Sequence, residues 1–215
     1  MKSRLKYFPQ IFDFIYEIVL LNSCFLVSNV IFFQIFFVID LKFEFLPIYF
    51  LTSLTFYPSL SALLKVTKTK NTSTIVRVFC KEFKNSIKKN WQQFTGLNFL
   101  MFILIGNLYL LTTDTFFSAT LSTANLLFAF LLLLFLVTIL EESGTASGNN
   151  LLKKGLFLFL KKGVKNLLFL TLAAGVLVLG FKISFFSMLF IFGLIIKMWD
   201  YIFIGRETSS FGISN

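Results

Sequence analysis

The chain has 215 residues, of which 57% are hydrophobic and only 14% are charged, and its formal net charge is +10. Soluble domains carry about 25% charged residues, so this deficit, with a mean hydropathy of +0.84, excludes an ordinary soluble domain. Histidine is absent, which removes the commonest general base and zinc ligand. No phosphate-binding loop, nucleophile elbow or metal-spaced cysteine cluster occurs either. We therefore expect no enzyme, cofactor or metal site.

Long apolar stretches predict membrane-spanning helices, because a bilayer core about 30 Å thick needs about 20 apolar helical residues. The first stretch is far longer than the h-region of a signal peptide and is followed by no small-residue cleavage site, so we expect it to be retained. The predicted spans are residues 14–39, 45–64, 94–111, 116–140, 167–181 and 183–203. The sequence thus predicts an all-α, polytopic membrane helical bundle forming one domain over residues 1–215.

The last two predicted spans come from one apolar run over residues 167–196. As a single helix this run would be about 45 Å long, which is too long to cross a bilayer once. Gly180 and Lys182 interrupt the run. A short fifth span and a sixth span follow from this interruption, and a protein with five spans is the alternative.

The distribution of cations predicts the orientation of the chain. Eighteen of the twenty Lys and Arg residues precede the first span, follow the second or fourth span, or lie at the C-terminal end. Only Lys42 and Lys182 lie on the other side of the six-span arrangement. Because cytoplasmic loops are enriched in Lys and Arg, we expect both termini in the cytoplasm. The cations are then expected to contact anionic lipid headgroups rather than nucleic acid.

Two basic segments predict amphipathic helices on the cytoplasmic side. Over residues 74–91, apolar side chains recur at helical spacing from Val76 to Trp91, and cations occupy the other faces. This helix either lies in the membrane interface or docks on the protein's own cytoplasmic face, and the pattern is compatible with both. A weaker copy covers residues 150–165. The candidate lipid or partner contacts are Arg77, Lys81 and Lys88.

Polar residues inside the apolar stretches are further candidates. Asn22, Asn107 and Asn125 lie deep enough to contribute to a solute path if they converge, although Asn in a span usually bonds to another helix. Asp13 and Glu17 are four residues apart and share one helix face, so the pair contacts either a cation or partner, or a lysine of the adjacent basic helix.

Proline and cysteine give two expectations about the backbone. Pro58 lies inside the second predicted span, where it removes a backbone donor and predicts a kink. Ser59 and Ser61 are candidate local partners for the carbonyl group that this kink frees. Cys24 and Cys80 are expected on opposite sides of a membrane boundary, so no disulfide is expected between them.

Three blocks resemble the YesL-like integral membrane proteins of bacteria, also called domain of unknown function 624. EIVLLNSCF is similar to the family pattern LxxLNxxW and lacks its Trp, and PSLSALLKV is similar to PxxxAL. FCKEFKNSI is similar to FWKAFKKNF, with Cys80 in the place of the Trp and Ser86 in the place of the Asn. The positions that match the family pattern are Asn22, Pro58, Phe83 and Lys84.

The resemblance implies a location and a process. YesL-like proteins resemble accessory components encoded beside sugar-uptake ABC transporters and glycan-degrading enzymes in Gram-positive bacteria. We therefore expect a non-enzymatic accessory protein in the bacterial plasma membrane, with an ABC-transporter permease as a candidate partner. A small-solute transporter or channel subunit is the first alternative, and a lipid-interacting membrane scaffold is the second.

Overall fold

The computed structural model describes residues 7–67, 74–111, 116–143, 149–183 and 188–203, and every element in these ranges is a helix. The all-α class expected from the sequence is confirmed for these residues. The elements are α1 (Tyr7–Ser28), α2 (Val30–Val38), η2 (Phe43–Phe45), α3 (Leu46–Thr52), η3 (Ser53–Thr55), α4 (Phe56–Val66), α5 (Ile75–Leu110), α6 (Phe116–Glu142), α7 (Asn149–Ile183) and α8 (Met188–Phe203).

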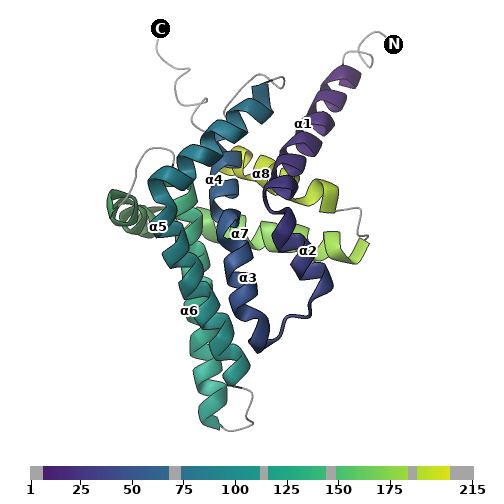
Figure 1. The fold of residues 1–215 in the computed structure, drawn as a ribbon. Coiled ribbons are helices and arrows are strands. Elements are labelled where there is room, and N and C mark those ends of the chain that lie inside the picture. Colours follow the sequence, from purple (N-terminus) through teal and green to yellow (C-terminus); the bar gives the residue numbers. More distant parts are fainter. Residues whose placement is uncertain (1–6, 68–73, 112–115, 144–148, 184–187, 204–215) are drawn as a thin grey trace.

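Two groups of helices cross one another (Figure 1). Helices α5 and α6 run along the long axis of the molecule, and α3 and α4 pack beside α5. Helices α7 and α8 run across this direction in the same view, and α1 packs against α8. Where the groups meet, the core contains the buried side chains of Phe25, Leu63, Phe94 and Ile139.

Three helices are long and apolar enough to cross a membrane by length and composition: Ile75–Leu110, Ala119–Glu142 and Asn150–Gly180. A fourth candidate is the broken pair Phe12–Ser28 and Val30–Val38, whose two halves are bent by 74°. In the most apolar stretches of the three long helices, only 22% to 39% of the residues are buried. Most of their apolar surface therefore faces outward, as in a membrane protein.

The second predicted span, over residues 45–64, is divided into three short pieces. Helix α3 ends at Thr52, a 3-10 turn covers Ser53–Thr55, and α4 begins at Phe56. Pro58 lies in the first turn of α4, where its missing N–H costs no hydrogen bond. The interruption therefore lies just before the proline that predicts it.

The helix after residue 149 is longer than the sequence pattern indicates. The predicted interfacial segment 150–165 and the predicted span 167–181 form one continuous helix, α7. No proline separates them, and an internal glycine such as Gly163 costs only about 1 kcal/mol relative to alanine, which does not end a packed helix. Helix α8, which lies within the predicted span 183–203, has only 16 residues. Six separate long spans are therefore not present in the described residues.

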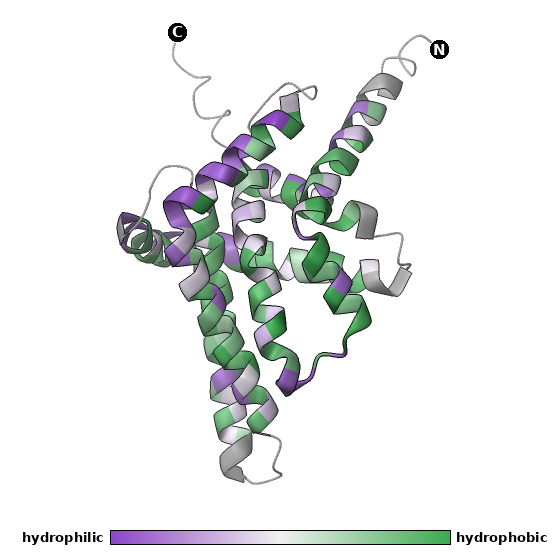
Figure 2. Ribbon diagram, viewed as in Figure 1, coloured by the Kyte–Doolittle hydropathy of each residue, from purple (hydrophilic) through white to green (hydrophobic). Residues whose placement is uncertain are grey.

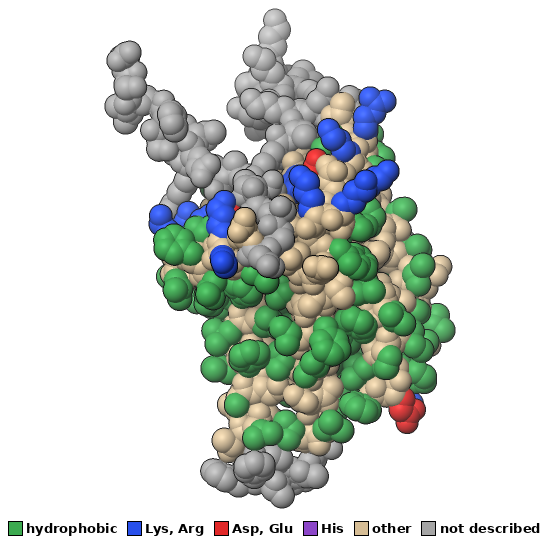
Figure 3. Space-filling model, turned by 60° about the vertical axis from the view of Figure 1, so that its left-hand side comes forward, with side chains coloured by type: hydrophobic (Ala, Val, Ile, Leu, Met, Phe, Trp, Pro, Cys, Tyr) green, Lys and Arg blue, Asp and Glu red, His purple; other side chains and the backbone are tan. Residues whose placement is uncertain are grey.

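Charge is concentrated at one end of the molecule. Hydrophilic residues mark the first half of α5, whereas the second half of α5 and most of α6 are hydrophobic (Figure 2). Figure 3 shows Lys and Arg side chains gathered above a broad hydrophobic surface. We call the end formed by the first half of α5 the basic end.

Candidate functional site

Asn22 joins α1 to α8 in a closely packed contact. Its side chain is 0% exposed, and its Oδ1 atom accepts hydrogen bonds from the backbone N–H groups of Phe192 at 3.1 Å and Gly193 at 3.4 Å. A Cβ atom at Gly193 would lie only 2.4 Å from the carbonyl oxygen of Ile18. The two helices can approach this closely because residue 193 has no side chain. The structure thus places Asn22 in a helix junction.

A salt bridge reinforces the same junction. The Lys197 ammonium of α8 lies 2.5 Å from a carboxylate oxygen of Glu17 on α1, and both side chains are 19% exposed. The lysine that pairs with Glu17 therefore belongs to the last described helix, and the expectation of a lysine from the adjacent basic helix is wrong. Asp13, which the sequence groups with Glu17, is exposed.

The bend between α1 and α2 faces the break between α3 and α4. Asn29, at the bend, donates to the carbonyl oxygen of Phe25 at 2.9 Å and to Ser59 Oγ at 3.1 Å. Thr55 Oγ1 donates to Asn29 Oδ1 at 3.0 Å, and Ser59 Oγ donates to the Thr55 carbonyl at 2.6 Å. Polar side chains at the two interruptions thus bond to one another and to backbone carbonyls in one cluster, as polar groups in an apolar environment require.

A second polar junction lies where α4, α5 and α6 meet. Ser61 Oγ of α4 lies 2.5 Å from Ser143 Oγ at the end of α6, so Ser61 bonds between helices and not locally. Asn90 Nδ2 donates to the Ser143 carbonyl at 3.4 Å. The backbone of Asn90 is also non-helical, with φ −127° and ψ 16°. This kink lies near the end of the predicted segment 74–91 and before the predicted span 94–111, and α5 contains nearly all of both.

The three asparagines proposed for a solute path make contacts in different places. Asn125 of α6 is half-buried and donates to the Leu104 carbonyl of α5 at 2.8 Å. Asn107 is exposed and lines a mainly apolar hollow beside Phe50 and Phe102. Asn22 contacts α8 instead. Within the described residues, the three side chains share no hydrogen bond.

The first half of α5 presents a row of exposed cations. Lys65 of α4 pairs with Glu82 of α5 at 3.2 Å. Five exposed cations of α5 make no ion pair with another described residue. These five, which we call the α5 cations, are Arg77, Lys81, Lys84, Lys88 and Lys89. They include all three predicted contact residues.

The opposite face of this segment docks on the protein. Ile75, Phe79 and Ser86 are buried, and this part of α5 packs on α4. Phe83, a family-pattern position, is half-buried and stacks on Phe79 with ring centroids 5.9 Å apart. The other edge of the apolar stripe remains open, since Val76 is 47% and Trp91 37% exposed. Docking on the protein's own surface therefore describes the buried face of this helix, and its placement in the membrane interface stays a prediction for the open edge.

Two lysines of α7 hold its first half against the end of α6. Lys154 lies 2.6 Å from Glu142, and Lys162 lies 2.5 Å from Glu141. The sequence pattern identifies a basic helix here but gives no sign of these partners. Elsewhere, Cys24 and Cys80 are free thiols.

Comparison with known proteins finds no matching family model, no similar curated protein and no similar solved structure. Among the described residues, no three His, Cys, Asp or Glu side chains lie together as a metal site would require. Two features remain on which a function can be based: the exposed α5 cations and the buried polar contacts between helices.

Proposed function

We propose that the chain is a non-enzymatic accessory protein of the bacterial plasma membrane that binds an acidic partner surface through the α5 cations. One observation carries the proposal: five exposed cations without ion pairs among the described residues share a helix whose opposite face is fixed on α4. Unneutralised charge on a rigid support favours association with a surface of opposite charge and fixes its orientation.

The topology we propose has six crossings, with both termini and the α5 cations in the cytoplasm. The clustering of Lys and Arg at the basic end supports this orientation, because cytoplasmic segments are enriched in these residues (Figure 3). The broken pairs α1–α2 and α3–α4 each supply one crossing, and the second half of α5 and α6 supply two. Helices α7 and α8 run across α5 and α6 in Figure 1, so they supply the last two crossings only if they turn toward the direction of α5 and α6.

The partner we propose is the permease subunit of a carbohydrate ABC transporter. The resemblance of the blocks around Asn22, Pro58 and Phe83 to YesL-like proteins supports this choice. The packing supports an accessory role over a transport path, since Asn22, Asn29 and Ser61 bond to neighbouring helices. Exposed Val76 and Trp91 favour one alternative, a scaffold that lies on lipid.

Site-specific photocrosslinking in native membranes tests the proposal. A benzophenone amino acid replaces Lys84 in one variant and exposed Glu44, in η2, in a control variant. We expect an ABC-permease subunit to be captured from position 84 and not from position 44. Capture of lipid alone from position 84, or of the same proteins from both positions, contradicts the proposal.

A functional arm uses the triple substitution K81E/K84E/K88E. These exposed residues contact no carboxylate among the described residues, so the fold should be unaffected by the change. We expect the variant to reach the membrane in normal amount, to lose the permease crosslink and to reduce uptake of at least one oligosaccharide. Unchanged uptake across a broad panel of sugars would remove carbohydrate transport from the proposal.

A further inference from the structure

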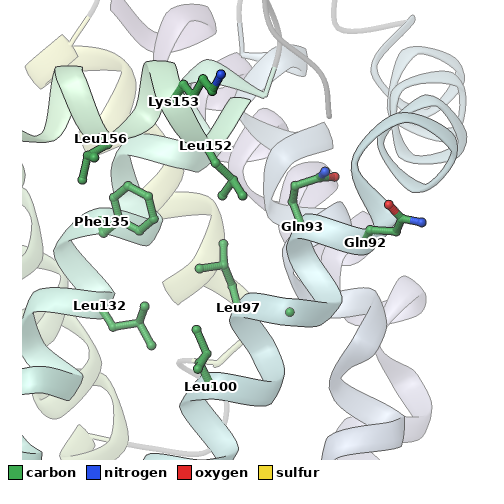
Figure 4. Close-up of a pocket in the computed structure, with 10 residues that line it drawn as sticks. Gln92, Gln93, Leu97, Leu100, Leu132, Phe135, Leu152, Lys153 and Leu156 are labelled. Carbon is green, nitrogen blue, oxygen red and sulfur yellow. The ribbon is translucent and has the colours of Figure 1, made fainter. Parts of the chain in front are cut away.

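A groove of about 640 Å³ lies between α5, α6 and α7. Its rim carries Gln92, Gln93 and Lys153, and its floor is apolar (Figure 4). Gly96 lies on the α5 side, where a Cβ atom would meet nothing within 4 Å. We call this feature the α5–α7 groove; it is separate from the α5 cations.

The groove changes from polar to apolar along the helix axis. Gln92 and Gln93 follow the kink at Asn90, next to the basic end, and Leu97 and Leu100 lie one and two turns further along α5. Figure 4 shows Lys153 above Leu97 and Leu100 and the two glutamines to their upper right, with Leu152 between Lys153 and Gln93. The distance from Gln92 to Leu100 is about 12 Å at 1.5 Å per residue. This order matches a lipid headgroup followed by the start of an acyl chain.

The polar groups on the rim are available to a ligand. Gln92, Gln93 and Lys153 make no hydrogen bond or ion pair with another described residue, whereas the neighbouring Lys154 is paired with Glu142. Together the rim offers amide N–H donors and one ammonium group, the donors that a phosphate accepts. No carboxylate lines the groove, so the cationic headgroup of a zwitterionic lipid finds no partner there.

We propose that the α5–α7 groove binds one anionic phospholipid. The phosphate lies at Lys153 and the two glutamine amides, and an acyl chain runs past Gly96 along Leu97, Leu100 and Phe135. Charge complementarity at the rim and the open apolar floor favour this ligand.

Native mass spectrometry of the delipidated full chain tests the site. The protein in detergent is titrated with phosphatidylglycerol and with phosphatidylcholine of the same acyl chains. We expect one phosphatidylglycerol to remain bound under activation that removes phosphatidylcholine. Lys153→Ala should weaken phosphatidylglycerol binding about fivefold, as expected for one lysine near an anionic headgroup. Lys161→Ala is the matched control, because Lys161 is exposed on the same helix outside the groove lining.

Gly96→Leu tests the apolar part of the site. The leucine side chain has open space to occupy, so the variant should fold and should exclude both lipids. Gly96→Ala, which adds one methyl group, should retain phosphatidylglycerol. Equal retention of the two lipids by the unmodified protein, or binding unaffected by both Lys153→Ala and Gly96→Leu, would overturn the proposal. A lipid-free dimer that Gly96→Leu dissociates would also overturn it, by showing that a second copy fills the groove.

Discussion

Gly193 of α8 lies so close to Ile18 of α1 that a Cβ atom at position 193 would be 2.4 Å from the Ile18 carbonyl oxygen. The contacts on either side of Gly193 show that the two helices run antiparallel: residue numbers rise along α1 as they fall along α8. Glu17 pairs with Lys197 at 2.5 Å, and Phe25 packs on Phe192 with ring centroids 4.4 Å apart. Helix α8 is therefore held to α1 by a seam in which the glycine sets the separation.

Gly193→Ala should destabilise the protein by about 1–3 kcal/mol, because the added methyl group overlaps backbone that cannot rotate away. Thermal unfolding in detergent, followed by tryptophan fluorescence, measures the change. Gly175→Ala in α7 is the control: a Cβ atom there meets nothing within 4 Å, so we expect a neutral or stabilising effect of up to about 1 kcal/mol. Equal melting temperatures for the two variants would contradict the close approach.

Asn22→Leu should also lower stability, by about 1–3 kcal/mol, since it removes the acceptor for the N–H groups of Phe192 and Gly193 in a buried place. Asn107→Leu is the control, because Asn107 is exposed and should tolerate the change. Thermal unfolding of both variants measures the difference. If Asn22 lined a solute path, its substitution would alter flux and leave the melting temperature unchanged.

The membrane class and the helical segments were predictable because they depend on local composition. The break in the second predicted span was also partly predictable, since Pro58 marks it. The bend at Asn29 was not, because asparagine alone ends few helices. Its geometry depends on Thr55 and Ser59, which lie 26 and 30 residues away in the sequence.

The same limit applies to the candidate site. Periodicity identified the α5 cations, because charge on one helical face is a local property. The partners of Asn22 could not be predicted, since they lie 170 and 171 residues further along the chain. The continuity of α7 could not be predicted, because the change from basic to apolar composition resembles a boundary although no residue there ends a helix.

Lys162→Met should loosen α7 from α6. It leaves Glu141, whose side chain is 18% exposed, without its ammonium partner at 2.5 Å. An unpaired and largely buried carboxylate is costly, so we expect a loss of about 1–3 kcal/mol in the free energy of unfolding. Lys161→Met, at an exposed neighbour, should have little effect. The exchanged pair K162E/E141K should recover much of the stability. If Lys162→Met loses no stability and the exchanged pair restores none, this ion pair does not anchor α7.

Asn90→Ala should straighten α5. Alanine is the best helix former, and the change also removes the hydrogen bond from Asn90 Nδ2 to the Ser143 carbonyl. Spin labels at Cys80 and at a cysteine replacing exposed Leu110, with Cys24 changed to Ser, report the distance between positions 80 and 110 by pulsed electron paramagnetic resonance. We expect the distance distribution to move to longer values, and the control Lys89→Ala to leave it unchanged. An unchanged distribution in Asn90→Ala would mean that the docking of Ile75 and Phe79 on α4 imposes the kink, because those contacts remain in the variant.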